Sequence, residues 1–324
     1  MQFQTQISIH QSNYDIKYGD KILSIGSCFS EHLADILGDL KYDILKNPFG
    51  ITFNPISIFS CIKRCIIGNS LLEEELIKTG NLWAHHDFHG SFNKINPQAF
   101  VENANISIQN ANAFLKKVDF VIITLGTSLV YRLLSNKEIV NNCHKLPSNH
   151  FEQHSLSVEE IANCLKELIS NISDHADKKV NFVLALSPVR YIKDGLIENQ
   201  KSKASCLIAI HQICDQLDNV NYFPSYELVL DELRDYRFYK EDMVHPSAVA
   251  VKHVSEKFMD YYFNESESTL RNEITKIRNS LNHRPLHKDD PAFVEFQNNL
   301  LKKMELLEKK YPELSFELEK KQLI

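Results

Sequence analysis

Short apolar runs alternate along this chain with longer stretches that have helical spacing. The apolar runs lie at residues 21–26, 42–45, 118–125, 180–186 and 220–223, and the helical stretches between them lie at 30–37, 56–67, 98–117, 158–172 and 199–217. Apolar runs of four to eight residues predict buried strands, whereas apolar residues at every third or fourth position predict amphipathic helices. The alternation therefore predicts an α/β fold, in which helices cover a mainly parallel sheet.

Three further segments complete the layout of this unit. Residues 71–78 have helical spacing, residues 129–140 predict a hairpin around Ser135 and Asn136, and residues 247–263 predict a last helix.

The composition changes after residue 264, where charged residues become frequent and the strand signals vanish. Helices are expected there at 265–281 and 291–310. We therefore predict an α/β domain over residues 1–264 and a C-terminal helical extension over residues 265–324. The extension is expected to pack on the domain or on a second subunit, which would make the protein a homo-oligomer.

Charge and composition exclude several classes of function. The 324 residues include 42 acidic and 36 basic side chains, and this net charge of −6 argues against nucleic acid as a partner. Nine glycines and no GxGxxG pattern argue against a dinucleotide cofactor. The seven cysteines are odd in number and scattered, which predicts reduced thiols in a cytoplasmic protein. Neither a signal-peptide core nor a run of about 18 apolar residues is present, so no membrane association is expected.

Residues suited to acyl-transfer chemistry stand where two predicted strands end and where the last helix begins. Ser27 follows the first strand, Gly126 and Thr127 follow the strand at 118–125, and Asp242 precedes His245 by three residues. Ligand sites of open α/β sheets form at the carboxyl ends of strands. A serine hydroxyl needs a base to take its proton, and the base needs an acceptor that orients it. Asp242 and His245 can supply both groups from one turn, and we expect Ser27 to meet His245 across a crevice.

Each of these residues also has a plainer interpretation. Ser27 could cap the N-terminus of the first helix, and the turn would then still expose its side chain. His245 could be a structural histidine bonded to Asp242. Cys28 is a rival nucleophile because a thiolate is more reactive than an alcohol, although an unpaired cysteine at this place is expected to face the sheet.

Several short segments, in order, resemble one known family. Residues 26–29 spell GSCF, similar to the signature of the GSCFA-domain family, although Ser30 stands where that family usually has alanine. The same family is resembled by NPFGI at 47–51, TLGT at 124–127, NCHK at 142–145, SPVR at 187–190 and EDMVHPS at 241–247. The resemblance covers about residues 20–260 and does not extend equally to the C-terminal helices. GSCFA proteins are placed with the SGNH hydrolases, which implies a flavodoxin-like three-layer sandwich and esterase chemistry.

The resemblance also implies roles for individual residues. Ser27 matches the nucleophile, His245 the general base and Asp242 the group that orients it. The superfamily binds the oxyanion with the serine amide, a glycine amide and an asparagine side chain.

Gly50 matches the glycine of that oxyanion site, with Asn47 and Asn54 as alternative donors beside it. The asparagine of that oxyanion site has no match, because Gly126, Thr127 and Ser128 stand where the superfamily has it. Either a hydroxyl takes over the role of this donor, or an asparagine from elsewhere in the chain does, or the site is slow. Loss of one such donor costs about 10²–10³ in turnover in subtilisin, the measured case.

Three other polar residues are candidates for contacts with substrate. His85 and His86 lie in a segment rich in aromatic and histidine residues, and Arg190 follows a predicted strand end, where it could meet an anionic group. An ordinary ion pair is the alternative for Arg190, and a satisfied half-buried loop is the alternative for the histidines.

These observations together predict an esterase that cleaves O-acyl esters, such as acetyl esters on carbohydrates, with no metal and no organic cofactor. The expected partner is a small-molecule or glycan ester. An O-acyltransferase that uses the same residues is one alternative. A non-catalytic module that binds a carbohydrate or a partner protein on a degenerate SGNH fold is the other.

Overall fold

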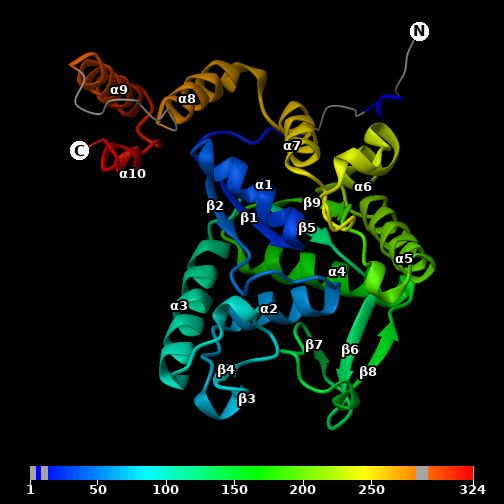
Figure 1. Ribbon diagram of the computed structural model, residues 1–324. Coiled ribbons are helices and arrows are strands. Elements are labelled where there is room, and N and C mark those ends of the chain that lie inside the picture. Colours follow the sequence, from blue (N-terminus) through cyan, green and yellow to red (C-terminus); the bar gives the residue numbers. More distant parts are fainter. Residues whose placement is uncertain (1–4, 9–13, 282–290, 324) are drawn as a thin grey trace.

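Five parallel strands form the centre of the computed structural model, which describes residues 5–8, 14–281 and 291–323 (Figure 1). They are β1 (Lys21–Gly26), β2 (Asp43–Lys46), β5 (Phe120–Leu125), β9 (Asn181–Leu186) and β10 (Val220–Phe223). Their order is β2-β1-β5-β9-β10, which is the 2-1-3-4-5 order of flavodoxin-like sheets when the strands are counted along the chain. The predicted α/β fold with a parallel sheet is confirmed.

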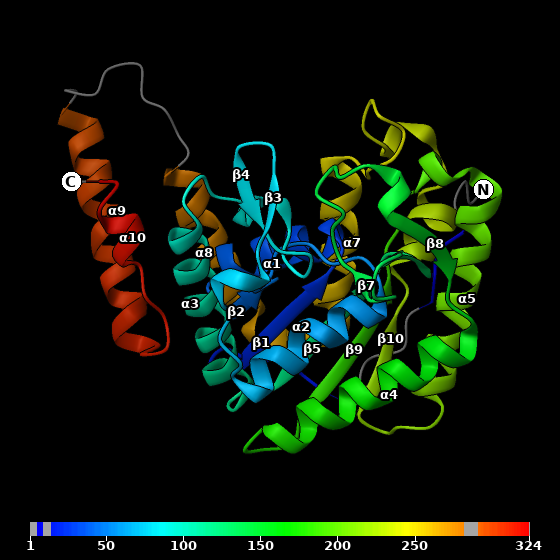
Figure 2. The same cartoon turned by 90° about the horizontal axis from the view of Figure 1, so that it is seen from below.

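Helices cover both faces of this sheet and give three layers (Figure 2). One face packs on α1 (Cys28–Asp39) and α7 (Ala248–Tyr262), and the other on four helices: α2 (Pro55–Ile67), α3 (Pro97–Leu115), α4 (Val158–His175) and α5 (Leu196–Cys214). Successive side chains of a strand point to opposite faces, so Ile22 joins the first apolar cluster and Leu23 the second. Both faces of the inner strands β1, β5 and β9 are buried, which explains why these strands consist mostly of apolar residues.

The predicted helix at residues 71–78 is wrong. The structure has a short 3₁₀ turn there (Glu73–Glu75), followed by a small hairpin of β3 (Ile77–Thr79) and β4 (Leu82–Ala84). Asn105 on α3 accepts from the Leu71 N–H at 2.7 Å and donates to the Leu71 carbonyl at 3.1 Å. These tertiary hydrogen bonds fix the Leu71 backbone from outside, and such a contact overrides local helical preference.

The predicted hairpin at residues 129–140 is confirmed. Strand β6 (Leu129–Leu133) pairs antiparallel with β7 (Ile139–Val140), and β8 (Phe151–Ser155) adds a third strand on the other side of β6. The pattern of apolar residues did not predict β8, because its sequence FEQHS has one apolar residue and its side chains are half-buried or exposed.

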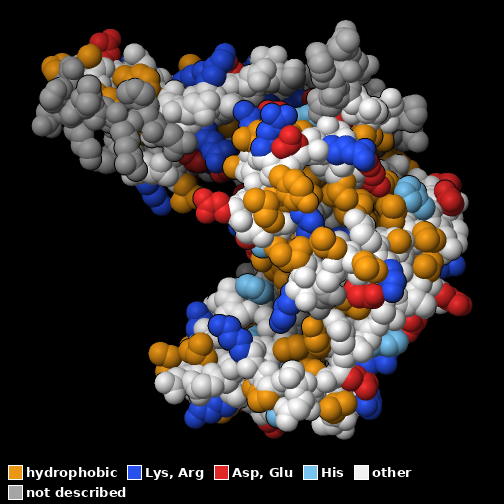
Figure 3. All heavy atoms as spheres, turned by 45° about the vertical axis from the view of Figure 1, so that its right-hand side comes forward, with side chains coloured by type: hydrophobic (Ala, Val, Ile, Leu, Met, Phe, Trp, Pro, Cys, Tyr) orange, Lys and Arg blue, Asp and Glu red, His pale blue; other side chains and the backbone are white. Residues whose placement is uncertain are grey.

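The C-terminal helices have an apolar core of their own. Helices α8 (Ser268–Leu281), α9 (Pro291–Lys310) and α10 (Glu317–Lys320) enclose seven buried apolar side chains: Leu270, Ile274, Ile277, Leu300, Met304, Leu314 and Phe316. The expected helix at 291–310 is confirmed, and that at 265–281 begins as a 3₁₀ turn (Glu265–Glu267) before α8. Figure 3 shows a deep hollow between this part of the molecule, at the top, and the lower part of the α/β unit. The domain division at residue 264 stays a prediction.

None of the helices in the described part of the chain combines the length and the apolar character needed to cross a bilayer.

Candidate active site

The tight turn between β1 and α1 requires a glycine and leaves a serine hydroxyl unpaired. Gly26 has φ +138°, and a Cβ atom placed there would lie 2.2 Å from the Thr124 carbonyl oxygen. Ser27 takes the N-cap position of α1, but its side chain makes no capping hydrogen bond. Its Oγ is buried and has no hydrogen-bond partner among the described residues. Buried polar atoms are rarely unpaired, so this one needs an explanation. Because the hydroxyl makes no capping bond, capping α1 is not its role.

Ser27 is also completely buried, with 0% of its surface exposed. The expectation that the turn exposes this side chain is therefore wrong. The Ser27 N–H is used inside the fold as well, because it donates to the Thr124 carbonyl at 3.2 Å.

Asn47 is the second residue in this region with an unpaired polar atom. It follows β2 directly, and its Oδ1 accepts from the Gly26 N–H at 2.8 Å. The N–H donor fixes which end of the amide faces Gly26, so the other end carries the Nδ2 donors. Nδ2 is buried with no partner in the described structure, and Asn47 has a left-handed φ of 35°. An amide donor and a hydroxyl, both without partners, thus flank Gly26.

The other residues expected to bind an oxyanion are already engaged. The Gly50 N–H donates to the Asn47 carbonyl at 2.7 Å. Asn54 caps α2, accepting from the Ser57 N–H at 2.9 Å and donating to the Ser57 hydroxyl at 3.0 Å. The Thr127 hydroxyl bonds to the Ser202 hydroxyl at 2.9 Å and accepts from the Leu129 N–H at 3.0 Å.

A buried lysine that the sequence analysis missed holds the loop that starts at Gly126. Lys203 on α5 is 2% exposed, and its Nζ donates to the Gly126 carbonyl at 2.7 Å and to the Ser187 carbonyl at 2.6 Å. These carbonyls directly follow β5 and β9, so one side chain ties two central strand ends together. Its place, three residues before Cys206 on the buried face of a helix, was the available signal.

Burial lowers the pKa of Lys203 to about 7. A neutral amine has two N–H donors, which match the two carbonyls. Between pH 7 and 10.5 the unfolded chain therefore binds a proton that the native protein lacks, and stability rises with pH in this window.

We expect the Lys203→Met variant to lack this dependence. The free energy of unfolding of the wild type should rise relative to that of the variant by about 1.4 kcal/mol per pH unit above pH 7. Urea unfolding at pH 6, 7, 8 and 9 measures the difference. Lys201→Met, which removes an exposed lysine paired with Glu198, is the matched control and should give a constant difference. A constant difference for Lys203→Met as well would contradict the prediction.

Asp242 and His245 form a hydrogen-bonded pair in a turn before α7. Asp242 Oδ2 lies 2.7 Å from His245 Nδ1, and Oδ1 accepts from the His245 N–H at 3.0 Å and the Val244 N–H at 2.9 Å. These bonds hold the pKa of the Asp242 carboxyl well below its usual range, and the bond from the His245 N–H has the largest effect. Asp242 therefore stays ionised at neutral pH. The side chains of His245 and Asp242 are 40% and 46% exposed, so the pair can meet a ligand.

The first turns of α1 face the turn that carries Asp242 and His245. Burial lowers the pKa of the His32 imidazole, and the charges of Lys240 and His245 contribute from the facing turn. Burial, followed by the charge of Glu31, raises the pKa of the Cys28 thiol, so Cys28 stays protonated at neutral pH. No hydrogen bond joins Ser27 Oγ to His245.

The two predicted histidines belong to a different cavity. His85 and His86 line a cavity of about 830 Å³ with α2 and the β6–β7 hairpin, and neither Ser27 nor His245 is part of its wall. His86 Nδ1 bonds to the Asn142 carbonyl at 2.9 Å, and His85 Nδ1 accepts from the Asp87 N–H at 3.0 Å. The structure therefore does not bring these histidines to the predicted triad.

Arg190, in contrast, is attached to the turn that carries His245. Its backbone N–H donates to the Val244 carbonyl at 3.1 Å, and Nη1 donates to the Met243 carbonyl at 3.3 Å.

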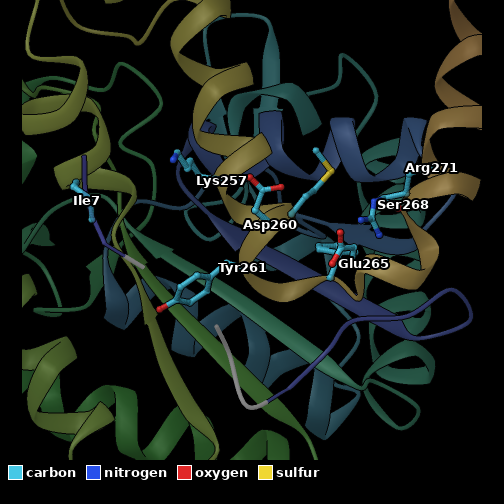
Figure 4. Close-up of a pocket in the computed structure, with 9 residues that line it drawn as sticks. Ile7, Lys257, Asp260, Tyr261, Glu265, Ser268 and Arg271 are labelled. Carbon is cyan, nitrogen blue, oxygen red and sulfur yellow. The ribbon is translucent and has the colours of Figure 1, made fainter. Parts of the chain in front are cut away.

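A second cavity, of about 570 Å³, lies at the far end of α7 (Figure 4). Lys257, Asp260 and Arg271 are among its lining side chains. Helix α7 has 15 residues, so its two ends are about 22 Å apart at 1.5 Å per residue. This cavity is therefore separate from the turn with Asp242 and His245.

Comparison with known proteins gives two family matches. The model of the GSCFA family matches residues 21–258, and that of the GSCFA domain protein, C-terminal domain, matches residues 274–323. No curated protein matches the chain. Among solved structures, a protein from Streptococcus pneumonia provisionally described as a platelet activating factor is similar, with 13% identity and a TM-score of 0.41. That match covers 75% of this chain and 83% of the other.

Proposed function

The chain belongs to the GSCFA family, and from this premise we propose that it is an SGNH-type serine hydrolase that cleaves O-acyl esters. The observation that carries the proposal is the unpaired Ser27 hydroxyl at the carboxyl end of β1. This end lies where the strand order reverses between β1 and β5, the place at which α/β sheets bind ligands. The half-exposed pair of Asp242 and His245 lies on the segment that faces the start of α1.

In the proposed reaction, Ser27 Oγ attacks the ester carbonyl and His245 Nε2 takes the hydroxyl proton. The tetrahedral intermediate collapses when His245 returns this proton to the leaving alcohol, which leaves an acyl group on Ser27. Water then attacks the acyl group while His245 takes a proton from it, and His245 returns this proton to Ser27 Oγ as the Ser27–acyl bond breaks and the acid is released. The ionised Asp242 holds Nδ1 protonated and stabilises the imidazolium that forms.

Asn47 is the proposed donor to the oxyanion. Its Nδ2 is buried without a partner among the residues that the structure describes, while its Oδ1 is fixed by Gly26, the residue before the nucleophile. A fixed amide in a water-poor site stabilises negative charge better than a hydroxyl that can rotate. Asn47 would thus replace the superfamily asparagine in whose place this chain has Gly126, Thr127 and Ser128.

The burial of Ser27 favours a second candidate function. A hydroxyl with no exposed surface reacts only if the groups that cover it move when substrate binds. If they do not move, the fold is a binding module without turnover. An O-acyltransferase would use the same residues and differ only in the acceptor.

A fluorophosphonate probe, which reacts with activated serine hydroxyls, tests the proposal on the full-length protein. We expect one probe per chain by intact mass, located on Ser27 by peptide mapping. Labelling should be lost in Ser27→Ala, whereas Cys28→Ala and Ser30→Ala, which change neighbouring residues, should still be labelled. Labelling of Ser27→Ala at the wild-type rate would refute the nucleophile. A folded wild type that is not labelled at all would favour the binding module.

A further inference from the structure

A small groove with aromatic walls adjoins the turn that carries His245. It has a volume of about 250 Å³, and its lining includes Arg190, Tyr226, Tyr236, Tyr239, Asn199 and Gln200. Pockets for drug-sized ligands measure about 300–1,000 Å³, so this groove suits one ring-sized group. Tyr236, which lines the groove, is 65% exposed. The exposed Tyr236 offers a flat aromatic face and a hydroxyl to a sugar ring, and the exposed Gln200 offers an amide beside it.

Arg190 brings a positive charge to this groove and has no carboxylate partner among the described residues, since Asp235 in the groove wall pairs with Arg237. Its guanidinium lies 5.7 Å from the ring centre of Tyr236 and 5.3 Å from that of Tyr239. The neighbouring arginines differ, since Arg234 lies 3.6 Å from Asp231 and Arg237 lies 3.6 Å from Asp235. In the described part of the chain, the Arg190 guanidinium donates one hydrogen bond, from Nη1 to the Met243 carbonyl, and no carboxylate lies within 4.0 Å of it.

The position of the groove indicates which part of a substrate it would hold. Arg190 is bonded to the carbonyls of Met243 and Val244, the two residues before His245. In the proposed reaction, His245 gives its proton to the leaving alcohol, so a groove attached to its turn adjoins the alcohol side. A guanidinium binds carboxylate or phosphate with two parallel hydrogen bonds, which fixes both the charge and the orientation of such a group.

We propose that Arg190, Tyr236 and Tyr239 form a subsite for the alcohol part of the substrate, and that this part is a sugar ring with an anionic group. The assignment of the alcohol side rests on the proposed function, whereas binding of the anionic sugar does not. The enzyme is thereby selective for acyl esters of sugar acids or sugar phosphates over esters of neutral sugars.

Hydrolysis rates test the selectivity. For the full-length protein, kcat/KM should be at least tenfold higher for acetylated glucuronic acid or acetylated glucose 1-phosphate than for acetylated methyl glucoside. The first two compounds distinguish a carboxylate from a phosphate.

Arg190→Gln should raise KM for the charged ester at least tenfold and abolish the preference, and Arg190→Lys should restore it in part. Arg237→Gln, which removes a neighbouring arginine that has a carboxylate partner, should keep the wild-type preference. Equal kcat/KM for charged and neutral sugar esters would overturn the proposal. So would an equal loss of kcat on both in Arg190→Gln, because Arg190 would then only support the turn.

Binding measured by calorimetry separates this proposal from the proposed function. Glucuronic acid or glucose 1-phosphate should bind the wild type at least tenfold more tightly than Arg190→Gln, even if no ester is cleaved. Binding without turnover would support the subsite and refute the hydrolase. Turnover of 4-nitrophenyl acetate without any preference for charged sugars would refute the subsite and leave the hydrolase.

Discussion

Replacing His245 by alanine should lower the rate of ester hydrolysis by about 10⁴–10⁶-fold, as loss of a catalytic base does in serine hydrolases. Without the imidazole, nothing takes the proton of Ser27 or returns it to the leaving alcohol. The His245 side chain is 40% exposed and bonds to the Asp242 carboxylate. The free energy of unfolding should therefore change by less than about 1 kcal/mol. Steady-state hydrolysis of 4-nitrophenyl acetate and urea unfolding measure the two effects.

Two further variants make this test specific. Asp242→Asn keeps the shape of the pair but favours the wrong tautomer, and it should cost about 10⁴-fold, as the equivalent change does in trypsin. His211→Ala removes an exposed histidine from α5 whose ring centre lies 4.7 Å from that of Tyr222, away from the proposed site, and should leave hydrolysis unchanged. Wild-type hydrolysis by His245→Ala would show that the assignment of the base is incorrect.

Replacing Gly26 by alanine should destabilise the protein by about 3–5 kcal/mol. The new Cβ would lie 2.2 Å from the Thr124 carbonyl oxygen and 2.9 Å from its carbon, and both are backbone atoms of the adjacent central strand. Neither can move without disturbing the pairing of β1 with β5. The φ of +138° adds strain, because only glycine adopts it readily. Urea unfolding followed by circular dichroism measures the loss.

Gly38 on α1 provides the matched control. A Cβ there would meet only Ile44 Cγ2, at an ordinary distance of 3.6 Å. Because glycine costs about 0.5–1 kcal/mol in a helix relative to alanine, Gly38→Ala should stabilise the protein by up to that amount. A Gly26→Ala variant as stable as the wild type would mean that the turn is looser than the structure has it.

The sequence predicted the scaffold well because the scaffold depends on local patterns. Strands buried on both faces are continuous apolar runs, and the helices between them have clear 3.6-residue spacing. Residue spacing also predicted the contact between Asp242 and His245, since three residues in one turn suffice to form it. The hairpin at 129–140 followed from its turn residues in the same way.

The details around Ser27 could not be predicted, because they depend on contacts between distant segments. Which end of the Asn47 amide is free follows from the Gly26 N–H, 21 residues away. The engagement of the Gly50 amide follows from the conformation of one loop. Lys203 joins strand ends 61 residues apart, and a lysine on a helix is normally expected to reach solvent.

The proposed reacting groups come from opposite ends of the α/β unit, with Ser27 after its first strand and His245 before its last helix. A nascent polypeptide would already carry the hydroxyl while most of the molecule is still unmade, yet it would lack the base until synthesis has passed residue 245. Turnover would then begin only once translation of this unit is nearly complete, and proteolytic loss of either end would silence it.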